Sequence, residues 1–322
     1  MGKNVRICYH DRCFDGTSSA AVFSRFYREC IDPAAEFHFT GLTHKPAGVF
    51  FDDGMFDGEE NAIVDFKYSN SPKLTWWFDH HQSAFLTPED AEHFKRDRSG
   101  RKFFDPTYKS CTKFLAKVAG EKFGFRAEPL EELVRWADII DGAQYENPEA
   151  AVKMNVPATQ LALVIEASND DQMTMRLIPE MATKPLAEVI RLSFVAGQFQ
   201  QLYRRHENSL EVLRKQAEYE RGVVYFDISD YTLEGYNKFI PYFLYPDCYY
   251  SVGVSRSPQR IKVAVGSNPW RQPPPERDKN LASICERYGG GGHARVAAIS
   301  FDRNAAEVGR KAGLEIAEEL RR

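Results

Sequence analysis

The chain has 322 residues, of which 43% are hydrophobic and 27% charged, and its net charge is -4. This composition is typical of a globular protein and excludes a disordered chain. The slightly acidic balance argues against a broad basic surface for long nucleic acid. No run of about 18 apolar residues predicts a membrane helix, so we expect a cytoplasmic protein without a membrane partner.

We expect two domains, because a single hydrophobic core rarely grows beyond about 250 to 300 residues. The 6 cysteines are widely spaced and form no CxxC pair. This spacing excludes a zinc knuckle and a secreted disulfide scaffold.

The first half of the chain alternates short apolar runs with helical patterns, which predicts βαβ units around a mostly parallel sheet. Apolar residues recur at helical spacing over 16–30, where we expect a helix. Two more helices are predicted at 111–123 and 129–140. The predicted strands lie at 5–10, 36–42, 61–66 and 74–78.

A long helix is predicted from about residue 185 to 220, and it connects the two halves. After it, the predicted strands lie at 222–229, 249–257, 260–268 and 294–301, with helices at 282–288 and 305–322. We therefore expect an α/β fold with a first domain at 1–190, a helical linker at 191–220 and a smaller α/β domain at 221–322.

Acidic and histidine residues gather where predicted elements end. Carboxylates and imidazoles without paired thiolates suit Mn²⁺ or Mg²⁺, and there are enough of them for two ions. Two ions can share a carboxylate, bind a phosphate and activate water. The residues are His10, Asp11, Cys13 and Asp15 at the end of the first strand, Asp65 at the end of the third, Asp79, His80 and His81 after the fourth, and Asp138 and Asp141 at the end of the helix predicted at 129–140.

These stretches resemble the motifs of the DHH phosphoesterase superfamily in the form that carries a C-terminal DHHA1 domain. The family includes nano-RNases, phosphatases of 3′-phosphoadenosine 5′-phosphate, cyclic-dinucleotide phosphodiesterases and RecJ-type exonucleases. The resemblance implies an N-terminal DHH catalytic domain with a mostly parallel sheet and a DHHA1 substrate-binding domain. It rests on HDRCFDG at 10–16, VDF at 64–66, DHH at 79–81, an acid in WADIIDGAQY at 136–145 and GGGGHARVAA at 289–298.

The resemblance also implies a role for each motif residue. His10 would bind the first ion, Asp65 would bridge both ions, and Asp15, His80 and Asp141 would bind the second. Asp79 would orient His80, because a metal-bound imidazole normally gives its other N–H to a carboxylate or carbonyl. His81 would act as the catalytic group that faces the phosphate and donates to the departing oxygen.

One position departs from the family, whose first motif usually carries an acid where this chain has Cys13. A thiolate prefers softer ions than Mn²⁺. Three readings stay open: Asp11 replaces the missing ligand, Cys13 binds directly, or the first ion position is weakened. We rank Asp11 or water ahead of Cys13.

The glycine-rich stretch of the second domain resembles the DHHA1 substrate loop. Glycines let the backbone approach a ligand closely and present N–H groups to negative charge. Arg256 is our preferred phosphate clamp, because a guanidinium can hold phosphate through two parallel bonds. The other predicted substrate contacts are Gly291, Gly292, His293 and Arg295.

Together these features predict a hydrolase that uses water activated by two metal ions to cleave phosphate esters in small nucleotides or short oligonucleotides. Mn²⁺ is the expected ion, with Mg²⁺ or another divalent ion as alternatives. No long duplex nucleic acid is expected, and a homodimer is one candidate assembly. The alternatives are an exopolyphosphatase or pyrophosphatase, and a non-catalytic nucleotide-binding module in which Cys13 has disabled the chemistry.

Overall fold

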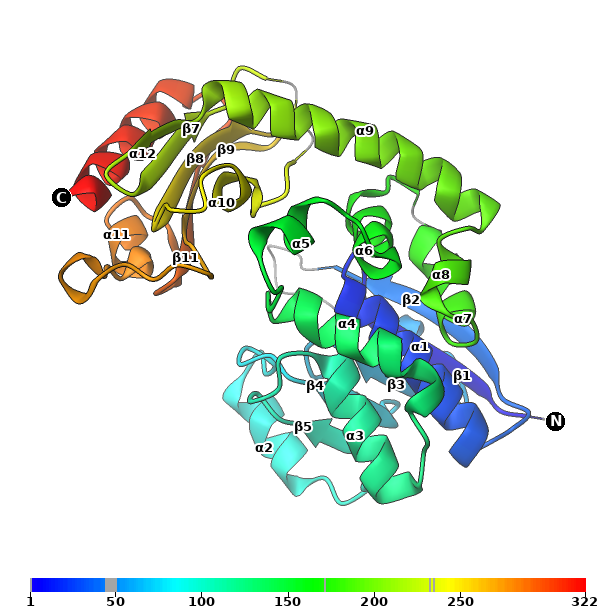
Figure 1. The fold of residues 1–322 in the computed structure, drawn as a ribbon. Helices are drawn as coiled ribbons and strands as arrows, with labels where there is room; N and C mark the ends of the chain where they lie inside the picture. The colour runs from blue at the N-terminus through cyan, green and yellow to red at the C-terminus, as the bar shows by residue number, and fades with distance from the viewer. Residues whose placement is uncertain (1, 44–50, 171, 232, 234) are drawn as a thin grey trace. The chain divides into compact units, whose positions relative to one another are not determined.

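A computed structural model of the chain describes residues 2–43, 51–170, 172–231, 233 and 235–322 (Figure 1). The chain divides into two compact units. The first unit holds Met1–Gln144 and Asn155–Leu202, and the second holds Tyr145–Met154 and Tyr203–Arg322. Among the described helices, none combines the length and the apolar character needed to cross a membrane.

The first unit is built on a five-stranded sheet with the order β2-β1-β3-β4-β5, in which every pair of neighbours is parallel. The expected fold class is thereby confirmed for this unit. β5 was not predicted, because three residues are too few to show a periodic pattern. The strands are β1 (Asn4–His10), β2 (Glu36–Leu42), β3 (Glu60–Val64), β4 (Trp76–Asp79) and β5 (Lys102–Phe104).

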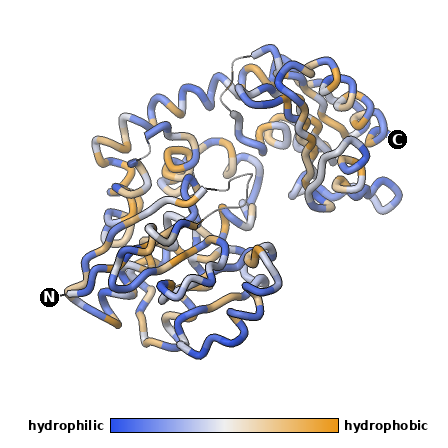
Figure 2. Tube along the Cα trace, turned by 180° about the vertical axis from the view of Figure 1, so that it is seen from behind, coloured by the Kyte–Doolittle hydropathy of each residue, from blue (hydrophilic) through white to orange (hydrophobic). Residues whose placement is uncertain are grey.

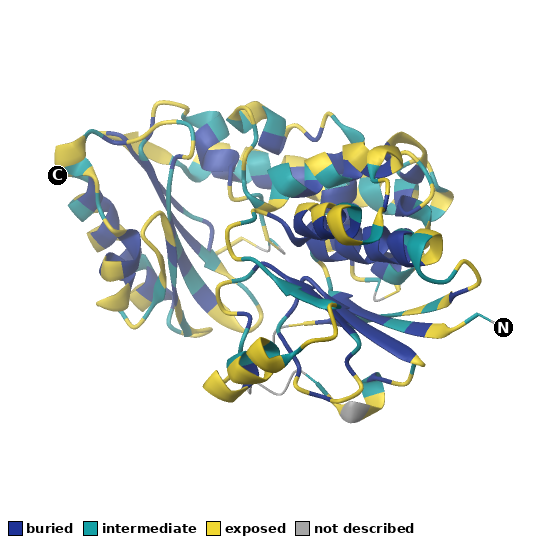
Figure 3. Cartoon of the chain, turned by 90° about the horizontal axis from the view of Figure 1, so that it is seen from below, coloured by how far each residue is buried: buried dark blue, intermediate teal, exposed yellow. Residues whose placement is uncertain are grey.

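The three central strands of this sheet, β1, β3 and β4, are largely buried (Figure 3), because helices and loops pack on both faces. Successive residues of a strand point to opposite faces, and β4 shows the consequence. Trp76 and Phe78 join the core beneath α1, whereas Trp77 joins a second core on the other face. The helices are α1 (Phe14–Cys30), α2 (Pro88–Arg96), α3 (Cys111–Phe123), α4 (Glu131–Asp141), α6 (Pro157–Ala167), α7 (Met173–Met181) and α8 (Leu186–Val189), with single 3-10 turns at Asp53–Met55 and Glu128–Leu130.

The prediction of one continuous helix from 185 to 220 is wrong. The chain forms α8, turns over residues 190–192, and starts again as α9 (Ser193–Gln216). In an unbroken helix Val189 and Val195 would project about 120° apart. Both are fully buried in the same core, so the turn lets both side chains reach it. Neither proline nor glycine stands at the break, which is why the sequence pattern does not reveal it.

The second unit is built on a six-stranded sheet with the order β10-β11-β9-β8-β7-β6. All neighbours are antiparallel except β7 and β8, which are parallel. In both units, hydrophobic residues run along the strands (Figure 2). The strands are β6 (Glu218–Glu220), β7 (Val223–Asp227), β8 (Tyr250–Arg256), β9 (Arg260–Ser267), β10 (Gly291–His293) and β11 (Val296–Asp302).

One face of this second sheet is covered by the C-terminal helix α12 (Ala306–Arg321). Gly313 makes the close approach possible, because a Cβ atom there would lie 2.7 Å from Cγ2 of Val254. The predicted α/β character of the C-terminal region is therefore confirmed. The other helices are α5 (Pro148–Val152), α10 (Ile240–Leu244) and α11 (Leu281–Glu286), with a 3-10 turn at Pro275–Arg277.

Residues 145–154 lie with the second unit although they follow α4 in the chain. The indole of Trp270 donates to the carbonyl of Tyr145 at 2.7 Å, and the amide of Asn237 donates to the carbonyl of Ala151 at 2.9 Å. These bonds attach the segment to the C-terminal part of the chain.

The buried carboxylate of Glu60, the first residue of β3, leads to a stability prediction. Glu60 is 4% exposed and accepts hydrogen bonds from Lys3 at 2.6 Å, Trp76 at 2.7 Å and Arg101 at 3.3 Å. Glu60→Ala leaves a buried indole N–H unpaired, so we expect it to lower the free energy of unfolding by about 2 to 4 kcal/mol in urea titrations.

The control for this substitution is Asp57→Ala. Asp57 pairs with Arg6 at 2.7 Å, but its side chain is 56% exposed, and an exposed pair typically contributes less than about 1 kcal/mol. Equal destabilisation by the two substitutions would contradict the assigned role of Glu60.

Candidate metal centre

The predicted ligands gather at the carboxyl edge of the first sheet. His10 is the last residue of β1, Asp65 follows β3 directly, and His80 follows β4. β1, β3 and β4 are neighbours in the sheet, so their carboxyl ends lie side by side. Open α/β sheets bind their ligands at this edge. Asp15 joins from the first turn of α1, and Asp141 from the last residue of α4.

Among the residues that the structure describes, two groups of three could each hold a cation, because their ligand atoms lie within 4.8 Å of one another. One group contains His10, Asp65 and His81, and the other contains Asp15, His80 and Asp141. The structure thus brings together all five residues that the sequence analysis assigned as firm metal ligands.

Asp65 lies between the two groups and presents one oxygen to each. Its Oδ2 is 3.3 Å from Nδ1 of His10, and its Oδ1 is 3.3 Å from Nε2 of His80. The residue is 1% exposed and has a φ of 58°. A left-handed backbone at a residue other than glycine costs of order 1 to 3 kcal/mol and occurs mostly at functional sites.

The second group is centred on the Nε2 atom of His80. This atom lies 3.7 Å from Oδ2 of Asp15 and 3.5 Å from Oδ2 of Asp141. Ligand atoms that sit about 2.0 to 2.3 Å from one ion lie about 3.0 to 3.8 Å from each other. The distances around His80 therefore match those within the coordination shell of a single ion.

Asp15 is held in place by the N-terminus of α3. Its carboxylate accepts the backbone N–H of Cys111 at 2.6 Å and that of Thr112 at 3.0 Å. The first N–H groups of a helix have no partner within the helix and favour negative charge. The sequence predicted this helix but not its contact with Asp15. The N-cap residue Ser110 was the feature that could have indicated it, because an N-cap marks where the free N–H groups of a helix lie.

Burial and crowding of like charges shift the pKa values of the acids. Burial, together with the charges of Asp65 and Asp141, raises the pKa of Asp15 well above its usual value. Burial and Asp65 also raise the pKa of Asp141 to about 6. For Asp65, interaction with His10 and His80 outweighs burial, and its pKa is lowered. A cation at this site would offset the repulsion among the three carboxylates.

Two buried atoms of the cluster lack hydrogen bonds within the described part of the chain. They are Oδ1 of Asp65 and Nε2 of His80, and an unpaired buried polar atom costs free energy. Carboxylate oxygens and imidazole nitrogens are suitable ligands for Mn²⁺ and for Mg²⁺. The donor set and the unpaired atoms therefore fit divalent cations.

Asp79 contacts a different histidine from the one expected. Its Oδ1 lies 2.7 Å from Nδ1 of His81 and also accepts the backbone N–H of His80 at 2.8 Å. Nδ1 of His80 instead lies 3.1 Å from the carbonyl oxygen of Tyr108. The backbone N–H groups of His80 and His81 hold the Asp79 carboxylate at the turn after β4, within reach of the His81 imidazole. Asp79 therefore orients His81 rather than His80.

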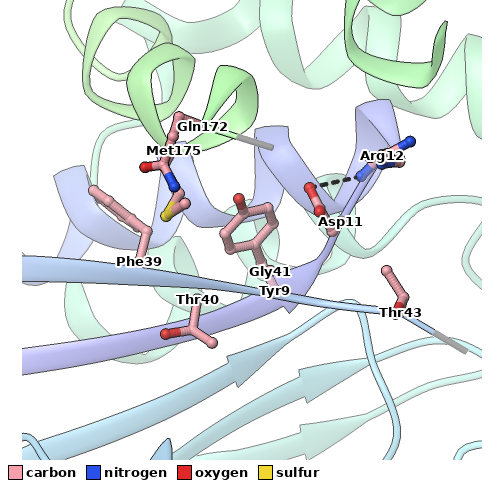
Figure 4. A pocket seen from close by; sticks show the side chains of 9 residues that line it. All are labelled: Tyr9, Asp11, Arg12, Phe39, Thr40, Gly41, Thr43, Gln172 and Met175. Carbon is pink, nitrogen blue, oxygen red and sulfur yellow. Dashed lines mark hydrogen bonds between the residues drawn. The ribbon is translucent and has the colours of Figure 1, made fainter. Parts of the chain in front are cut away.

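The two candidates for the missing first-motif acid point in different directions. The carboxylate of Asp11 accepts hydrogen bonds from the hydroxyl of Thr174 in α7 at 2.8 Å and from the backbone N–H of Arg12 at 2.9 Å. Its side chain lines a pocket of about 640 Å³, as Figure 4 shows among the labelled side chains. Asp11 belongs to neither ion group. The Sγ atom of Cys13, in contrast, lies 3.8 Å from Oδ2 of Asp65. The structure does not bring Asp11 to the cluster, so the reading in which Asp11 replaces the missing ligand is not supported.

Three of the predicted substrate residues, Gly291, Gly292 and His293, form β10, which pairs with β11 in a hairpin. A Cβ atom on Gly292 would lie 2.5 Å from the carbonyl oxygen of Val296, so this glycine is required by the hairpin itself. His293 is exposed. Arg295 forms two bonds with Asp278, at 2.6 and 3.1 Å.

Arg256 is not part of this hairpin. The strand register aligns Val296 with Gly266 and Gly266 with Ser251, whereas Arg256 pairs with Ile261 at the other end of β9. The five steps along β8 from Ser251 to Arg256 correspond to about 17 Å. The register therefore separates Arg256 from the hairpin that carries His293 and Arg295.

Comparisons with known proteins agree with this fold. No protein-family model matches the chain, and no curated protein matches it significantly. Among solved structures, the pGpG-specific phosphodiesterase PggH from Vibrio cholerae is similar with a TM-score of 0.69 and 20% identity, over 98% of this chain and 99% of PggH. RecJ from Thermus thermophilus, solved with Mg²⁺, is similar with a TM-score of 0.50 and 16% identity, over 99% of this chain and 50% of RecJ. The chain thus shares the fold of PggH over nearly the full length of both proteins, which agrees with the fold that the motif resemblance implied.

Proposed function

We propose that the chain is a metal-dependent phosphoesterase that hydrolyses phosphate ester bonds of small nucleotides or short oligonucleotides. The observation that carries this proposal is the pair of ion-sized groups at the carboxyl edge of the sheet, with Asp65 presenting one oxygen to each. A fold shared with PggH, a pGpG-specific phosphodiesterase, supports a dinucleotide as the substrate class.

The proposed ligands are His10 and Asp65 for one ion, and Asp15, His80, Asp141 and the second oxygen of Asp65 for the other. Two bound divalent ions would supply Lewis acidity toward the phosphate and lower the pKa of a bound water. The carbonyl of Tyr108 keeps the ring of His80 turned toward the carboxylates, and the N-terminus of α3 does the same for Asp15.

His81 is the proposed proton donor to the departing oxygen. Its side chain is 36% exposed, so substrate can reach it. Burial lowers its pKa, but the bond with Asp79 and the charge of Asp65 more than offset this, and the pKa is raised. When Nδ1–H of His81 donates a hydrogen bond to Asp79, Nε2–H of the protonated ring is left to give its proton to the leaving group, an arrangement that suits a general acid.

His293 in the β10–β11 hairpin is a proposed substrate contact, because it is exposed beside glycines that leave the backbone accessible. Arg295 is held by Asp278. We assign it the role of supporting the hairpin.

A panel of substrates tests the proposal. Purified protein with Mn²⁺ would be offered pGpG, pApA, 3′-phosphoadenosine 5′-phosphate, a cyclic dinucleotide and polyphosphate. We expect release of mononucleotides from at least one linear dinucleotide. Turnover of polyphosphate alone would favour an exopolyphosphatase. Nucleotide binding without any turnover would support the non-catalytic alternative.

Divalent ions should also stabilise the fold. When the free ion exceeds its dissociation constant about a hundredfold, binding to the native state adds about 2.7 kcal/mol to the free energy of unfolding. Urea titrations of chelator-treated protein with and without Mn²⁺ measure this change. Equal stability with Mn²⁺, with Mg²⁺ and without either ion would contradict the assigned metal centre.

A further inference from the structure

A pocket of about 640 Å³ lies at the carboxyl ends of β1 and β2, beside the start of α7. Its volume is within the range of about 300 to 1,000 Å³ that is usual for small-molecule sites. Its lining includes Asp11, the residue that directly follows the proposed metal ligand His10. None of the described residues that line the pocket belongs to either ion group. The pocket is therefore next to the candidate metal centre without being part of it.

One end of the pocket is apolar and aromatic. Figure 4 shows Phe39 and Met175 toward this end, with the ring of Tyr9 between them and Asp11. Phe39 and Met175 are half-buried, and Tyr9 is fully buried. Aromatic faces stack on nucleobases, and the flexible thioether of methionine adapts to the shape of a ligand. This end of the pocket therefore suits a flat aromatic ring.

The other end carries a carboxylate with one oxygen still available. Oδ1 of Asp11 accepts hydrogen bonds from Thr174 at 2.8 Å and from the backbone N–H of Arg12 at 2.9 Å. Among the described residues, none donates a hydrogen bond to Oδ2. Gly41 leaves room for this oxygen, because a Cβ atom there would lie 2.8 Å from it. Asp11 is thus held in one direction and keeps an acceptor open to a ligand.

A fixed carboxylate of this kind excludes several classes of ligand. It repels a phosphate or another carboxylate, and Asp11 is the only acid among the described lining residues, whereas Mg²⁺ and Ca²⁺ take about six oxygen ligands. A ring with N–H donors is the remaining partner. Guanine presents N1–H and an amino group side by side, whereas adenine presents an amino group beside an N1 acceptor, whose lone pair would meet that of the carboxylate.

We propose that this pocket holds a base of the substrate, and that Asp11 makes it select guanine over adenine. The ring lies against Phe39 and Met175, while Oδ2 of Asp11 accepts hydrogen bonds from the N–H groups at its edge. The same edge of the sheet carries His10, so a base bound here can bring its phosphate to the ions. This inference rests on the proposed function and names the base that the substrate carries.

The test is calorimetric binding of 5′-mononucleotides in the presence of Mn²⁺. GMP, IMP and AMP share the sugar and the phosphate, so differences among their dissociation constants report on the base. A hydrogen bond to a charged acceptor changes affinity by about tenfold or more. We expect GMP to bind at least about tenfold more tightly than AMP, with IMP, which lacks the amino group of guanine, in between. GMP binding no tighter than AMP binding would overturn the inference, whereas the proposed function is judged separately by dinucleotide hydrolysis.

Asp11→Asn isolates the available oxygen. The backbone N–H of Arg12 can only donate, so the asparagine keeps its oxygen at that position and places an amide NH2 group where Oδ2 stood. The dissociation constant for GMP should rise by about tenfold or more, while that for AMP changes little. Retained AMP binding shows that the variant is folded. Equal weakening of GMP and AMP would contradict the assigned selection.

Two further variants complete the test. In Gly41→Ala the added Cβ would lie 2.7 Å from Cγ of Asp11 and displace the carboxylate, so the preference for GMP should fall there as well. The matched control is Asp138→Asn, because Asp138 bonds Lys113 at 2.6 Å and does not line the pocket. Its preference should equal that of the wild-type chain. A preference for GMP that persists in both Asp11→Asn and Gly41→Ala would assign the selection of guanine to another site.

Discussion

Asp65→Asn is expected to lower kcat for dinucleotide hydrolysis by at least about a thousandfold. Asp65 presents an oxygen to both ion groups, at 3.3 Å from His10 and 3.3 Å from His80. An amide has nearly the same shape but offers a single neutral oxygen, so it cannot neutralise or join two cations. The measurement is the steady-state rate at saturating Mn²⁺, together with the number of ions bound per chain.

The matched control for a lost carboxylate at this edge is Asp138→Asn. Asp138 lies one turn before Asp141 on α4, but it bonds Lys113 at 2.6 Å and belongs to neither ion group. We expect Asp138→Asn to retain activity and Asp141→Asn to weaken ion binding. Full activity in Asp65→Asn would show that the metal centre has been misplaced.

His81→Gln is expected to lower kcat by about a hundredfold to ten-thousandfold, which is the usual contribution of a general acid. If His81 acts through proton donation, Mn²⁺ affinity should stay close to that of the wild-type chain. Calorimetric titration of Mn²⁺ separates the two roles, because His81 also lies in the group with His10 and Asp65.

Asp79→Asn provides a test of how His81 is oriented. The amide can still accept a hydrogen bond from Nδ1 of His81 but brings no charge to favour the protonated ring, so kcat should fall while KM changes little.

Loss of one bound ion in His81→Gln would assign His81 to the metal instead. Unchanged kcat in His81→Gln would contradict its role as proton donor.

The sequence was sufficient to predict that the candidate ligands lie together at one edge of the first sheet. A buried strand needs apolar residues, and a functional polar residue can follow only where the strand ends, so Asp65 and His80 stood out from the apolar runs before them. Parallel neighbours then bring such ends to the same edge. The gathering of the predicted ligands at one edge follows from these two rules.

The direction of individual side chains could not be predicted in the same way. Asp11 and Cys13 are two residues apart, yet one bonds α7 and the other faces Asp65, because Arg12 between them adopts a φ of 53° that turns the chain. Arg256 was chosen because a guanidinium can hold phosphate through two parallel bonds, and only the strand register shows that it lies at the other end of β8 and β9 from the hairpin with His293. Such contacts depend on tertiary pairing, which local patterns do not contain.

The central claim is that bound divalent ions make this chain a phosphoesterase, and the rate of dinucleotide hydrolysis as a function of added Mn²⁺ tests it most directly. Chelator-treated protein would be titrated with Mn²⁺ while mononucleotide release from pGpG and pApA is followed. The account predicts no release without the ion and a rate that saturates only after two equivalents are bound. Release that is independent of divalent ions, or no release at any Mn²⁺ concentration, would contradict it.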